Sequence, residues 1–421
     1  MPTRTIDVQC CISGGGPAGI VLGLLLARAG VEVMVLEKHA DFLRDFRGDT
    51  IHPSTLEVLN ELGILDEFLA RPHQEVSRLK AQFGDESFTV ADFSHLPVRC
   101  PFIVLMPQWH FLDFLADQGR RYPTFRLMMR SEVVDLIDDK GRIAGVRAET
   151  PDGTLDVRAP LVIGADGRHS VVRDRAGLEV RTLGAPMDVL WFELPRAFSD
   201  PADTMGRFDA GHIFIMINRT DYWQCGFVIP KGSAETVRAN GLPAFRVRIA
   251  ELAPFAAGRV GGLADWGSIK LLTVGVDRLR SWYRPGILCI GDAAHTMSPV
   301  GGVGINLAIQ DAVAAANILA APLRENRLTG TDLRAVQERR EWPTRFTQAA
   351  QVFVQNRVVN PALFGKGKFK PPLLVRLMKR FPILRRIPAH LIGMGIRPEH
   401  VHTREAARSG GMGRQPLRDG A

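Results

Sequence analysis

Two glycine-rich turns, each accompanied by a carboxylate, are the parts of the sequence whose residue types and spacing best suit chemistry. The first is Gly14-x-Gly16-x-x-Gly19. In a dinucleotide-binding turn the first glycine permits a sharp bend, the second lets the backbone approach a pyrophosphate, and the third lets helix and sheet pack closely. Glu37 follows 18 residues after Gly19, where an acid can accept hydrogen bonds from a ribose. The predicted dinucleotide-binding residues are Gly14, Gly16, Pro17, Ala18, Gly19, Glu37 and Lys38.

The second turn begins at Gly291 and Asp292, directly after the apolar run ILCI. A short carboxylate at the end of a buried strand can accept hydrogen bonds from the ribityl hydroxyls of a flavin. The glycine run that follows opens a long apolar helix, whose first N–H groups would stabilise a reduced, negatively charged isoalloxazine. A nicotinamide-binding protein has no need of this second helix start, so the two turns together predict FAD. The residues predicted here are Gly291, Asp292, Gly302, Gly304, Ile305 and Asn306.

The elements around these turns predict a doubly wound α/β sheet. Residues 6–13 are typical of a buried strand, 20–29 of an apolar helix and 31–36 of a second strand, which together form a βαβ unit. Residues 157–164 and 286–290 add buried strands, and 305–320 a long helix. Strand-like runs dominate from about 181 to 275. We therefore expect an α/β fold: a Rossmann-like FAD-binding domain interleaved with an antiparallel β-sheet domain, plus a helical basic C-terminal tail.

The expected domain boundaries follow from this alternation. The FAD-binding domain is predicted to be discontinuous, because the strand-rich runs interrupt it. It comprises residues 1–75, 107–180 and 276–360, and residues 76–106 and 181–275 form the substrate-binding sheet domain. Residues 361–421 form the basic C-terminal segment, which is predicted to be helical with a disordered end.

With these motifs in view, the chain resembles the class A flavoprotein monooxygenases, the family of para-hydroxybenzoate hydroxylase and its ubiquinone-pathway and antibiotic-tailoring relatives. The resemblance rests on three motifs between residue 6 and about residue 320. They are the first glycine turn, a stretch from Gly164 to Arg173 that is similar to the DG motif of the family, and a stretch from Gly291 to Asn306 that is similar to its GD motif.

The resemblance implies roles for further residues. Asp166, in the DG-like motif, would lie between the FAD diphosphate and an incoming nicotinamide nucleotide. Arg47 and Gln108 would contact FAD, although Arg44 is an alternative to Arg47 and Gln108 could be an ordinary polar residue at a helix start. Two residues of the GD-like motif, Pro299 and Gly301, would line the reacting edge of the flavin.

The resemblance also implies the reaction. NADH or NADPH would reduce FAD, O2 would form a flavin C4a-hydroperoxide, and one oxygen atom would transfer to an aromatic or similarly electron-rich small molecule. Three alternatives stay open at this stage: a flavin reductase or dehydrogenase, a flavin-dependent halogenase, and a non-catalytic carrier on the same fold. The WxWxIP-like stretch expected of a halogenase is absent from the sequence.

No residue type in the sequence identifies a catalytic base or a metal site. In the family, the turn that holds His295 is structural, which argues against catalysis by this histidine. Two strand-like runs carry His212, Phe214 and Met216, and Trp223, Cys225 and Phe227. Either set could line a substrate pocket, but alternating apolar residues in strands usually form core.

Charge and cysteine content bear on location and partners. The formal net charge is +8, but residues 361–421 alone hold 13 Lys and Arg against 3 Asp and Glu. This distribution argues against nucleic-acid binding by the main body. The five cysteines lack CxxC spacing, and the N-terminus lacks a signal-peptide pattern, so we expect buried thiols in the cytoplasm. Residues 364–394 could either contact an anionic membrane surface or fold back on the FAD domain.

Overall fold

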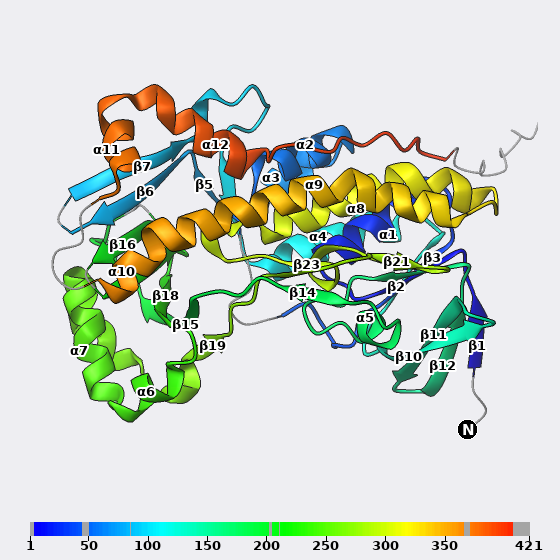
Figure 1. The fold of residues 1–421 in the computed structure, drawn as a ribbon, viewed down its shortest axis with the longest axis horizontal. Coiled ribbons are helices and arrows are strands. Elements are labelled where there is room, and N and C mark those ends of the chain that lie inside the picture. The colour runs from blue at the N-terminus through cyan, green and yellow to red at the C-terminus, as the bar shows by residue number, and fades with distance from the viewer. Residues whose placement is uncertain are drawn as a thin grey trace, which may run out of the picture.

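The computed structural model describes residues 4–43, 50–84, 86–201, 204–209, 211–365 and 371–406. In these ranges the chain forms two large sheets, spanned by the long helices α8 (Gly304–Arg324) and α9 (Gly330–Val354) (Figure 1). The fold is α/β, as the sequence predicts.

The described residues form a six-stranded sheet beneath α1 (Pro17–Arg28) and α8, and five of its strands are parallel. Four of these strands are buried on both faces, which explains why they are continuous apolar runs in the sequence, whereas the edge strand β9 (Phe125–Met128) is buried only in part. The sixth strand, at one edge, is antiparallel. In spatial order the strands are β21 (Tyr283–Arg284), β22 (Ile287–Cys289), β13 (Leu161–Gly164), β2 (Cys10–Ser13), β3 (Val33–Leu36) and β9 (Phe125–Met128).

Two predicted strands turn out to be pairs of strands that change sheets. Residues 6–13 divide into β1 (Arg4–Asp7) and β2, and residues 157–164 divide into β12 (Gly153–Arg158) and β13. The second break falls at Pro160, which has no N–H to donate to a ladder. Strands β1 and β12 pair with each other, beside the hairpin β11 (Arg142–Thr150) and β10 (Glu132–Asp139), which the sequence analysis did not name.

A seven-stranded sheet forms the second layer, and its strand pairs are antiparallel except for one. The exception is the parallel pair of β16 with β6, which joins the 76–106 stretch to the 181–275 stretch. The order is β19 (Lys270–Leu272), β15 (Met187–Pro195), β18 (Tyr222–Pro230), β17 (His212–Asn218), β16 (Met205–Asp209), β6 (Arg78–Phe83) and β7 (Glu86–Asp92). These pairings accord with the domain boundaries expected from the sequence, which stay predictions.

Helices pack on both large sheets, and shorter strands form two further sheets. Helix α1 is apolar on all sides because it packs between the parallel sheet and α8. The other helices include α2 (Pro53–Glu61), α3 (Leu65–Leu69), α4 (Gln108–Arg120), α5 (Val171–Arg175), α6 (Ala234–Ala239), α7 (Leu242–Leu252), α10 (Asn360–Phe364), α11 (Leu373–Arg380) and α12 (Arg386–Gly393); α1 spans Pro17–Arg28. Two three-stranded sheets contain β14 (Val180–Thr182), β20 (Asp277–Leu279) and β23 (His295–Thr296), and β4 (Thr50–Ile51), β8 (Ile103–Leu105) and β5 (Gln74–Val76).

One helix in the described part of the chain, Val300–Arg324, is long and apolar enough to cross a membrane. Because 78% of its most apolar window is buried inside the fold, its composition is that of a core helix.

The last described residues, 395–406, contain no helix and run back along the layer of the parallel sheet, in contact with α1 and α8; we call them the C-terminal strap. Arg28 Nη1 donates to the Thr403 carbonyl at 2.7 Å, and the Ala406 N–H donates to the Arg28 carbonyl at 2.9 Å. Glu399 of the strap is 5% exposed and lies against α9. The strap is therefore an integral part of the structure rather than a loose tail.

Candidate functional site

The first glycine turn connects β2 to α1 and presents an uncapped helix start. Gly14 has φ +102°, and a Cβ there would lie 2.4 Å from the Ala165 carbonyl oxygen. A Cβ at Gly19 would lie 1.9 Å from the Gly14 carbonyl oxygen, so both positions require glycine. Gly16 instead faces open space, with no atom within 4 Å of where its Cβ would be. Gly16 is also the N-cap of α1 and supplies no side-chain cap, which leaves the first N–H groups available to an anion.

The acid after β3 lies beside this turn. Glu37 is 8% exposed, and its Oε2 accepts from the Gly15 N–H at 2.8 Å, while Oε1 accepts from the His39 N–H at 3.1 Å. The carboxylate is thus fixed at the mouth of the glycine turn, where the sequence predicts a ribose contact. Lys38 projects away from it: its side chain is 56% exposed and lies 4.0 Å from Glu132.

The DG-like motif forms a tight turn that leads into α5. Asp166 Oδ1 accepts from the Ser170 hydroxyl at 2.5 Å, and its Oδ2 accepts from the Val172 N–H at 3.2 Å. Burial raises the pKa of Asp166 above its usual value, and these hydrogen bonds offset the rise only in part. Arg173, 8% exposed, donates to the Arg168 carbonyl at 2.9 Å and so holds the same turn. The visible role of Asp166 is to shape the turn; contact with a cofactor stays a prediction.

The GD-like turn brings the two glycine motifs together. Gly291 follows β22 with φ +58°, and a Cβ there would lie 3.2 Å from the Cβ atoms of both Ala18 and Ala308. Gly291 therefore lies between the start of α1 and the first turns of α8. Asp292 is half-buried beside it, at the carboxyl end of the parallel sheet. Switch points of this kind are where α/β sheets bind ligands.

Helix α8 also begins without a side-chain cap. Its N-cap is Val303, and the preceding residues Gly301 and Gly302 have φ +82° and +63°. The Thr50 hydroxyl donates to the Gly302 carbonyl at 3.0 Å, which ties this loop to β4. Pro299 and Gly301 are exposed, as residues that line an open edge would be, whereas Gly304 and Ile305 are half-buried.

The remaining predicted cofactor-binding residues are Asn306, Gln108 and Arg47, with Arg44 as the alternative to Arg47. Asn306 is 2% exposed, and its side-chain oxygen accepts from the Ser54 and Thr55 hydroxyls at 2.6 and 2.9 Å, so this side chain fastens α8 to α2. Gln108 is the half-buried first residue of α4. Arg47 and its alternative Arg44 lie outside the described residues. Cofactor contacts by all of these residues stay predictions.

His52 is a residue that the sequence analysis did not name. It precedes α2 and is fully buried, and its Nδ1 lies 2.7 Å from the Ile392 carbonyl. Because a carbonyl only accepts, Nδ1 must carry the hydrogen, which leaves Nε2 as a bare acceptor. Nε2 has no hydrogen-bond partner among the described residues. Burial lowers the pKa of His52, opposed in part by the nearby backbone of Ile392 and Gly302. A neutral, unsatisfied acceptor thus lies next to the glycine loop of α8.

Behind the GD-like turn lies a group of buried charges, which we call the Asp311 cluster: His295, Asp311, Arg340 and Glu399. His295 Nε2 is 2.6 Å from Asp311 Oδ2, which also accepts from the Gly291 N–H at 3.1 Å. Arg340 Nε donates to Asp311 Oδ1 at 2.9 Å, and its Nη1 donates to Glu399 at 3.3 Å. Burial alone would raise the pKa of Asp311, but the charges and hydrogen bonds of His295 and Arg340 outweigh it and lower the pKa. His295 therefore positions the turn, in agreement with its expected structural role.

The two predicted sets of sheet residues both lie on one face of the seven-stranded sheet. Phe214 pairs with Phe227, and Met216 pairs with Cys225. These side chains are buried against Phe245 and Ile249 of α7. Of the two open alternatives, the structure supports core packing.

The opposite face of the sheet carries what we call the Trp191 row: Trp191, Gly226, Ile215 and Gly206, which are neighbours across four strands. The indole lies over Gly226, where a Cβ would be 3.1 Å from two of its ring carbons. Trp191 and Ile215 pack in the same cluster as Val300, which directly follows Pro299. Trp191 Nε1 is buried and has no hydrogen-bond partner among the described residues. The row therefore forms a flat apolar surface, with one unsatisfied donor, on the side of the sheet towards the GD-like turn.

Comparison with known proteins identifies the family to which this chain belongs. A family model described as an FAD-binding domain matches residues 7–350. The chain is also 33% identical over 398 residues to 6-methylpretetramide 4-monooxygenase of Streptomyces rimosus, covering 92% of this chain and 93% of that protein. The chain belongs to this FAD-binding family, as a class A aromatic monooxygenase. It is an FAD-dependent monooxygenase of the aromatic hydroxylase type, with NAD(P)H as co-substrate.

Other relatives of this monooxygenase agree in class and fold. It is 24% identical over 340 residues to para-nitrophenol 4-monooxygenase of Pseudomonas sp. strain WBC-3, covering 76% of this chain and 79% of that protein. Its fold matches PqsL of Pseudomonas aeruginosa in complex with 2-aminobenzoylacetate, with a TM-score of 0.72 at 22% identity, covering 85% and 98% of the two chains. The sequence prediction of an FAD monooxygenase is thereby confirmed over the reductase, halogenase and carrier alternatives.

The described residues fit FAD on physical grounds. Two long helices start without side-chain caps on either side of Gly291, open space lies in front of Gly16, and His52 Nε2 is a buried acceptor without a partner. An anionic diphosphate and a ring system with polar edges match these groups.

Proposed function

We propose that this monooxygenase hydroxylates a flat, extended aromatic molecule that lies on the Trp191 row. The observation that carries the proposal is the flatness of this face: Gly226 lets the Trp191 indole lie against the sheet, and Ile215 and Gly206 continue the row beside it. Aromatic rings favour offset stacking, so a flat substrate would gain more from this surface than a globular one. Because a relative at 33% identity is named for 6-methylpretetramide, that compound is the first substrate to test.

In this proposal the first turn and the α8 loop hold the cofactor. The N–H groups at the start of α1 bind the diphosphate, Glu37 accepts from the ribose, and Asp292 accepts from the ribityl hydroxyls. The start of α8 and the His52 acceptor would hold the polar edge of the isoalloxazine. When bound, FAD supplies the redox chemistry, taking reducing equivalents from NAD(P)H and activating O2 for transfer to the substrate.

The protein's own contribution is to position the substrate and to exclude water. Trp191 Nε1 donates a hydrogen bond to a substrate oxygen, which sets the orientation of the ring on the row. Val300, Ile215 and the indole are apolar, so they keep water away from the substrate while the oxygen atom is transferred. No described residue near the row is an evident general base, so the substrate must be electron-rich in its own right.

Trp191→Phe tests the donor directly. The substitution keeps an aromatic surface but removes Nε1–H, so we expect the substrate Kd to rise by roughly fivefold, the value of about one neutral hydrogen bond. The fraction of NAD(P)H consumption that yields hydroxylated product rather than H2O2 should fall. Trp266→Phe is the matched control, because Trp266 packs in the α7-side cluster of the same sheet. Equal effects of the two substitutions on Kd and product yield would remove the Trp191 row from the substrate site.

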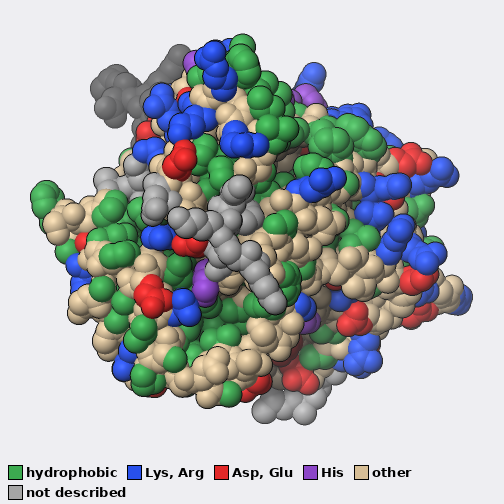
Figure 2. Space-filling model, turned by 60° about the vertical axis from the view of Figure 1, so that its left-hand side comes forward, with side chains coloured by type: hydrophobic (Ala, Val, Ile, Leu, Met, Phe, Trp, Pro, Cys, Tyr) green, Lys and Arg blue, Asp and Glu red, His purple; other side chains and the backbone are tan. Residues whose placement is uncertain are grey.

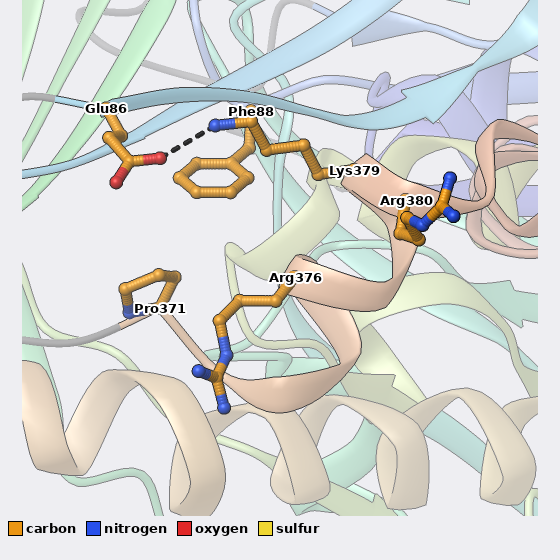
Figure 3. Close-up of a pocket in the computed structure, with 6 residues that line it drawn as sticks. All are labelled: Glu86, Phe88, Pro371, Arg376, Lys379 and Arg380. Carbon is orange, nitrogen blue, oxygen red and sulfur yellow. Dashed lines mark hydrogen bonds and ion pairs between the residues drawn. The ribbon is translucent and has the colours of Figure 1, made fainter.

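A second proposal concerns where the enzyme works: α11 contacts an anionic phospholipid surface. Leu373, Leu374 and Leu377 are 64%, 54% and 38% exposed on this helix. On the same helix, Arg376, Lys379 and Arg380 border a cavity of about 350 Å3 (Figure 3). Residues 371–393 contain five Lys and Arg and no acid. Apolar and basic side chains lie next to each other at the upper end of the face drawn in Figure 2. The cavity is lined by Glu86, Phe88, Pro371, Arg376, Lys379 and Arg380.

The supporting argument for a membrane is charge. Of the five cations, only Lys379 makes an ion pair among the described residues, with Glu86 at 2.7 Å. An apolar arc beside the other four is complementary to a bilayer with anionic headgroups, each cation adding about 1 kcal/mol near the surface. Vesicle pelleting tests this, with anionic and purely zwitterionic vesicles compared. The double variant Leu373→Ser with Leu377→Ser should lose binding to anionic vesicles, whereas Val247→Ser, 59% exposed on α7, should retain it. If the wild type stays in the supernatant with anionic vesicles, the contact does not exist. Point variants are preferable to deletion of residues 361–421, which would also remove Glu399.

A further inference from the structure

Helix α9 carries an apolar stripe that no described part of the fold covers. Trp342 and Phe353 are 55% and 58% exposed, and Phe346 is 39% exposed. With the exposed Ala349 they follow a spacing of four, three and four residues, which is the spacing of a helix-pairing seam. The opposite side of α9, with Val336, Arg340 and Gln351 among others, is buried against the body of the protein.

The stripe is continuous and points away from the molecule. The rings of Trp342 and Phe346 lie 5.9 Å apart, and the Arg357 guanidinium lies 5.8 Å from the ring centre of Phe353. Figure 1 shows α9 running across the front of the molecule, over α8. Exposed aromatic rings in a row, with an arginine at one end, have the composition that dominates binding energy at protein interfaces.

The stripe is self-complementary when a second copy runs in the opposite direction. A two-fold axis through the midpoint between Thr347 and Gln348 places Trp342 opposite the partner's Phe353. The same axis places Phe346 opposite the partner's Ala349, so that a large side chain meets a small one. The two-fold symmetry repeats each contact, as an isologous interface requires.

The charges at the ends of the stripe agree with the same register. This antiparallel register places the exposed Glu338 opposite the partner's Arg357. Arg357 makes no ion pair with any residue that the structure describes, and Glu338 pairs at 2.7 Å with Arg334 of its own chain. Within α9 four arginines stand against three acids, so an anionic membrane gains little here, in contrast to α11. We infer that α9 is the interface of a homodimer, in which two α9 helices pair antiparallel through this stripe.

The size of the contact sets what to measure. Two crossing helices bury a small interface, so the dimer should lie at the weak end of specific complexes and dissociate on dilution. Sedimentation velocity of the FAD-loaded enzyme over a wide concentration range should therefore move from monomer to dimer. Phe353→Ser should hold the protein at the monomer position. Phe198→Ser, which removes a fully exposed aromatic ring that lies outside α9, should leave the dimer intact. A wild type that is monomeric at every concentration overturns the inference.

A charge exchange tests the register. Glu338→Arg and Arg357→Glu should each weaken the dimer, because each sets like charges opposite one another. The double variant should restore it, since the pair is regenerated with reversed signs. Glu251→Arg is the matched control: like Glu338, Glu251 is exposed and paired with an arginine of its own helix, but it lies on α7. Failure of the double variant to recover would contradict this register.

Cross-linking distinguishes antiparallel from parallel pairing. The chain's five cysteines are all buried, so a thiol reagent should act at an introduced one. In the antiparallel register two Ala349→Cys residues lie about 5 Å apart along the helix axis, whereas two Ala335→Cys residues lie roughly 37 Å apart. A short bis-maleimide should therefore link Ala349→Cys and not Ala335→Cys. Cross-linking of both variants would indicate a parallel pair, and of neither would indicate that α9 is not the interface.

Discussion

His52 illustrates how one buried side chain can link the cofactor loop to the stability of the fold. Its ring stays neutral to a lower pH in the folded protein than in the unfolded chain, because burial lowers its pKa below the usual 6.5. The unfolded chain binds a proton near pH 6.5, so below that pH the unfolded state holds more protons than the folded state. The free energy of unfolding should therefore decrease as the pH falls below about 6.5.

His52→Asn should make the protein less sensitive to acid. Asparagine can still donate to the Ile392 carbonyl but does not titrate. Urea unfolding at several pH values between about 5 and 7 should show a shallower decline for the variant than for the wild type. Parallel curves would mean that His52 is protonated in the folded state as well.

At this same scale, some of the site could be foreseen and some could not. The sharp turn at Gly14 and the close packing at Gly19 follow from the sequence because the constraint on each glycine is local. The buried acceptor of His52 and the donor of Trp191 could not be foreseen, because both depend on which atoms the folded chain leaves without partners. The sheet face was also ambiguous: alternation in a strand shows that two faces differ, not which one α7 covers.

At the scale of elements, the proposed cofactor site lies at the starts of α1 and α8. Two glycines of the first turn allow effects on FAD binding and on folding to be measured separately. Gly16→Ala introduces a methyl group into open space, in an ordinary extended conformation. We expect an unchanged melting temperature without FAD but weaker FAD binding, because the methyl group stands where the diphosphate approaches.

Gly19→Ala should behave in the opposite way. Its methyl group would meet the Gly14 carbonyl oxygen at 1.9 Å, so the turn or the helix must move. We expect a loss of about 1–3 kcal/mol or more in the free energy of unfolding even without FAD. Differential scanning calorimetry of both apo-proteins, with fluorescence titration of FAD, distinguishes the two effects. A stable Gly19→Ala protein with normal FAD affinity would contradict the close packing of α1 on the turn.

The Asp311 cluster joins α8, α9 and the GD-like turn, so the loss of one of its side chains should destabilise all three. Arg340→Met leaves Asp311 buried without its arginine partner, whereas Glu399 keeps its ion pair with Arg339. We expect the free energy of unfolding to fall by about 3–5 kcal/mol. Arg248→Met, which removes an exposed i,i+3 ion pair on α7, should cost less than about 1 kcal/mol. Chemical unfolding followed by far-UV circular dichroism provides the comparison.

At the scale of the whole molecule, the sequence predicted the order of layers well and their joints poorly. The parallel strands are continuous apolar runs, and the βαβ unit is a strong local pattern, so this part could be foreseen. The division of residues 6–13 and 157–164 between two sheets could not, because a bend within an apolar run leaves little trace beyond Pro160. Helix α9 was not named from the sequence, since Trp342, Phe346 and Phe353 interrupt the polar face that marks a surface helix.

The C-terminal strap has a consequence for how the chain is made. Glu399 completes the charge balance of Arg339 and Arg340, more than a hundred residues after the GD-like turn that this cluster supports. Synthesis must therefore proceed past residue 399 before Arg339 and Arg340 can pair with Glu399. Nascent chains stalled before residue 399 should remain sensitive to protease within α9, and full-length chains should not.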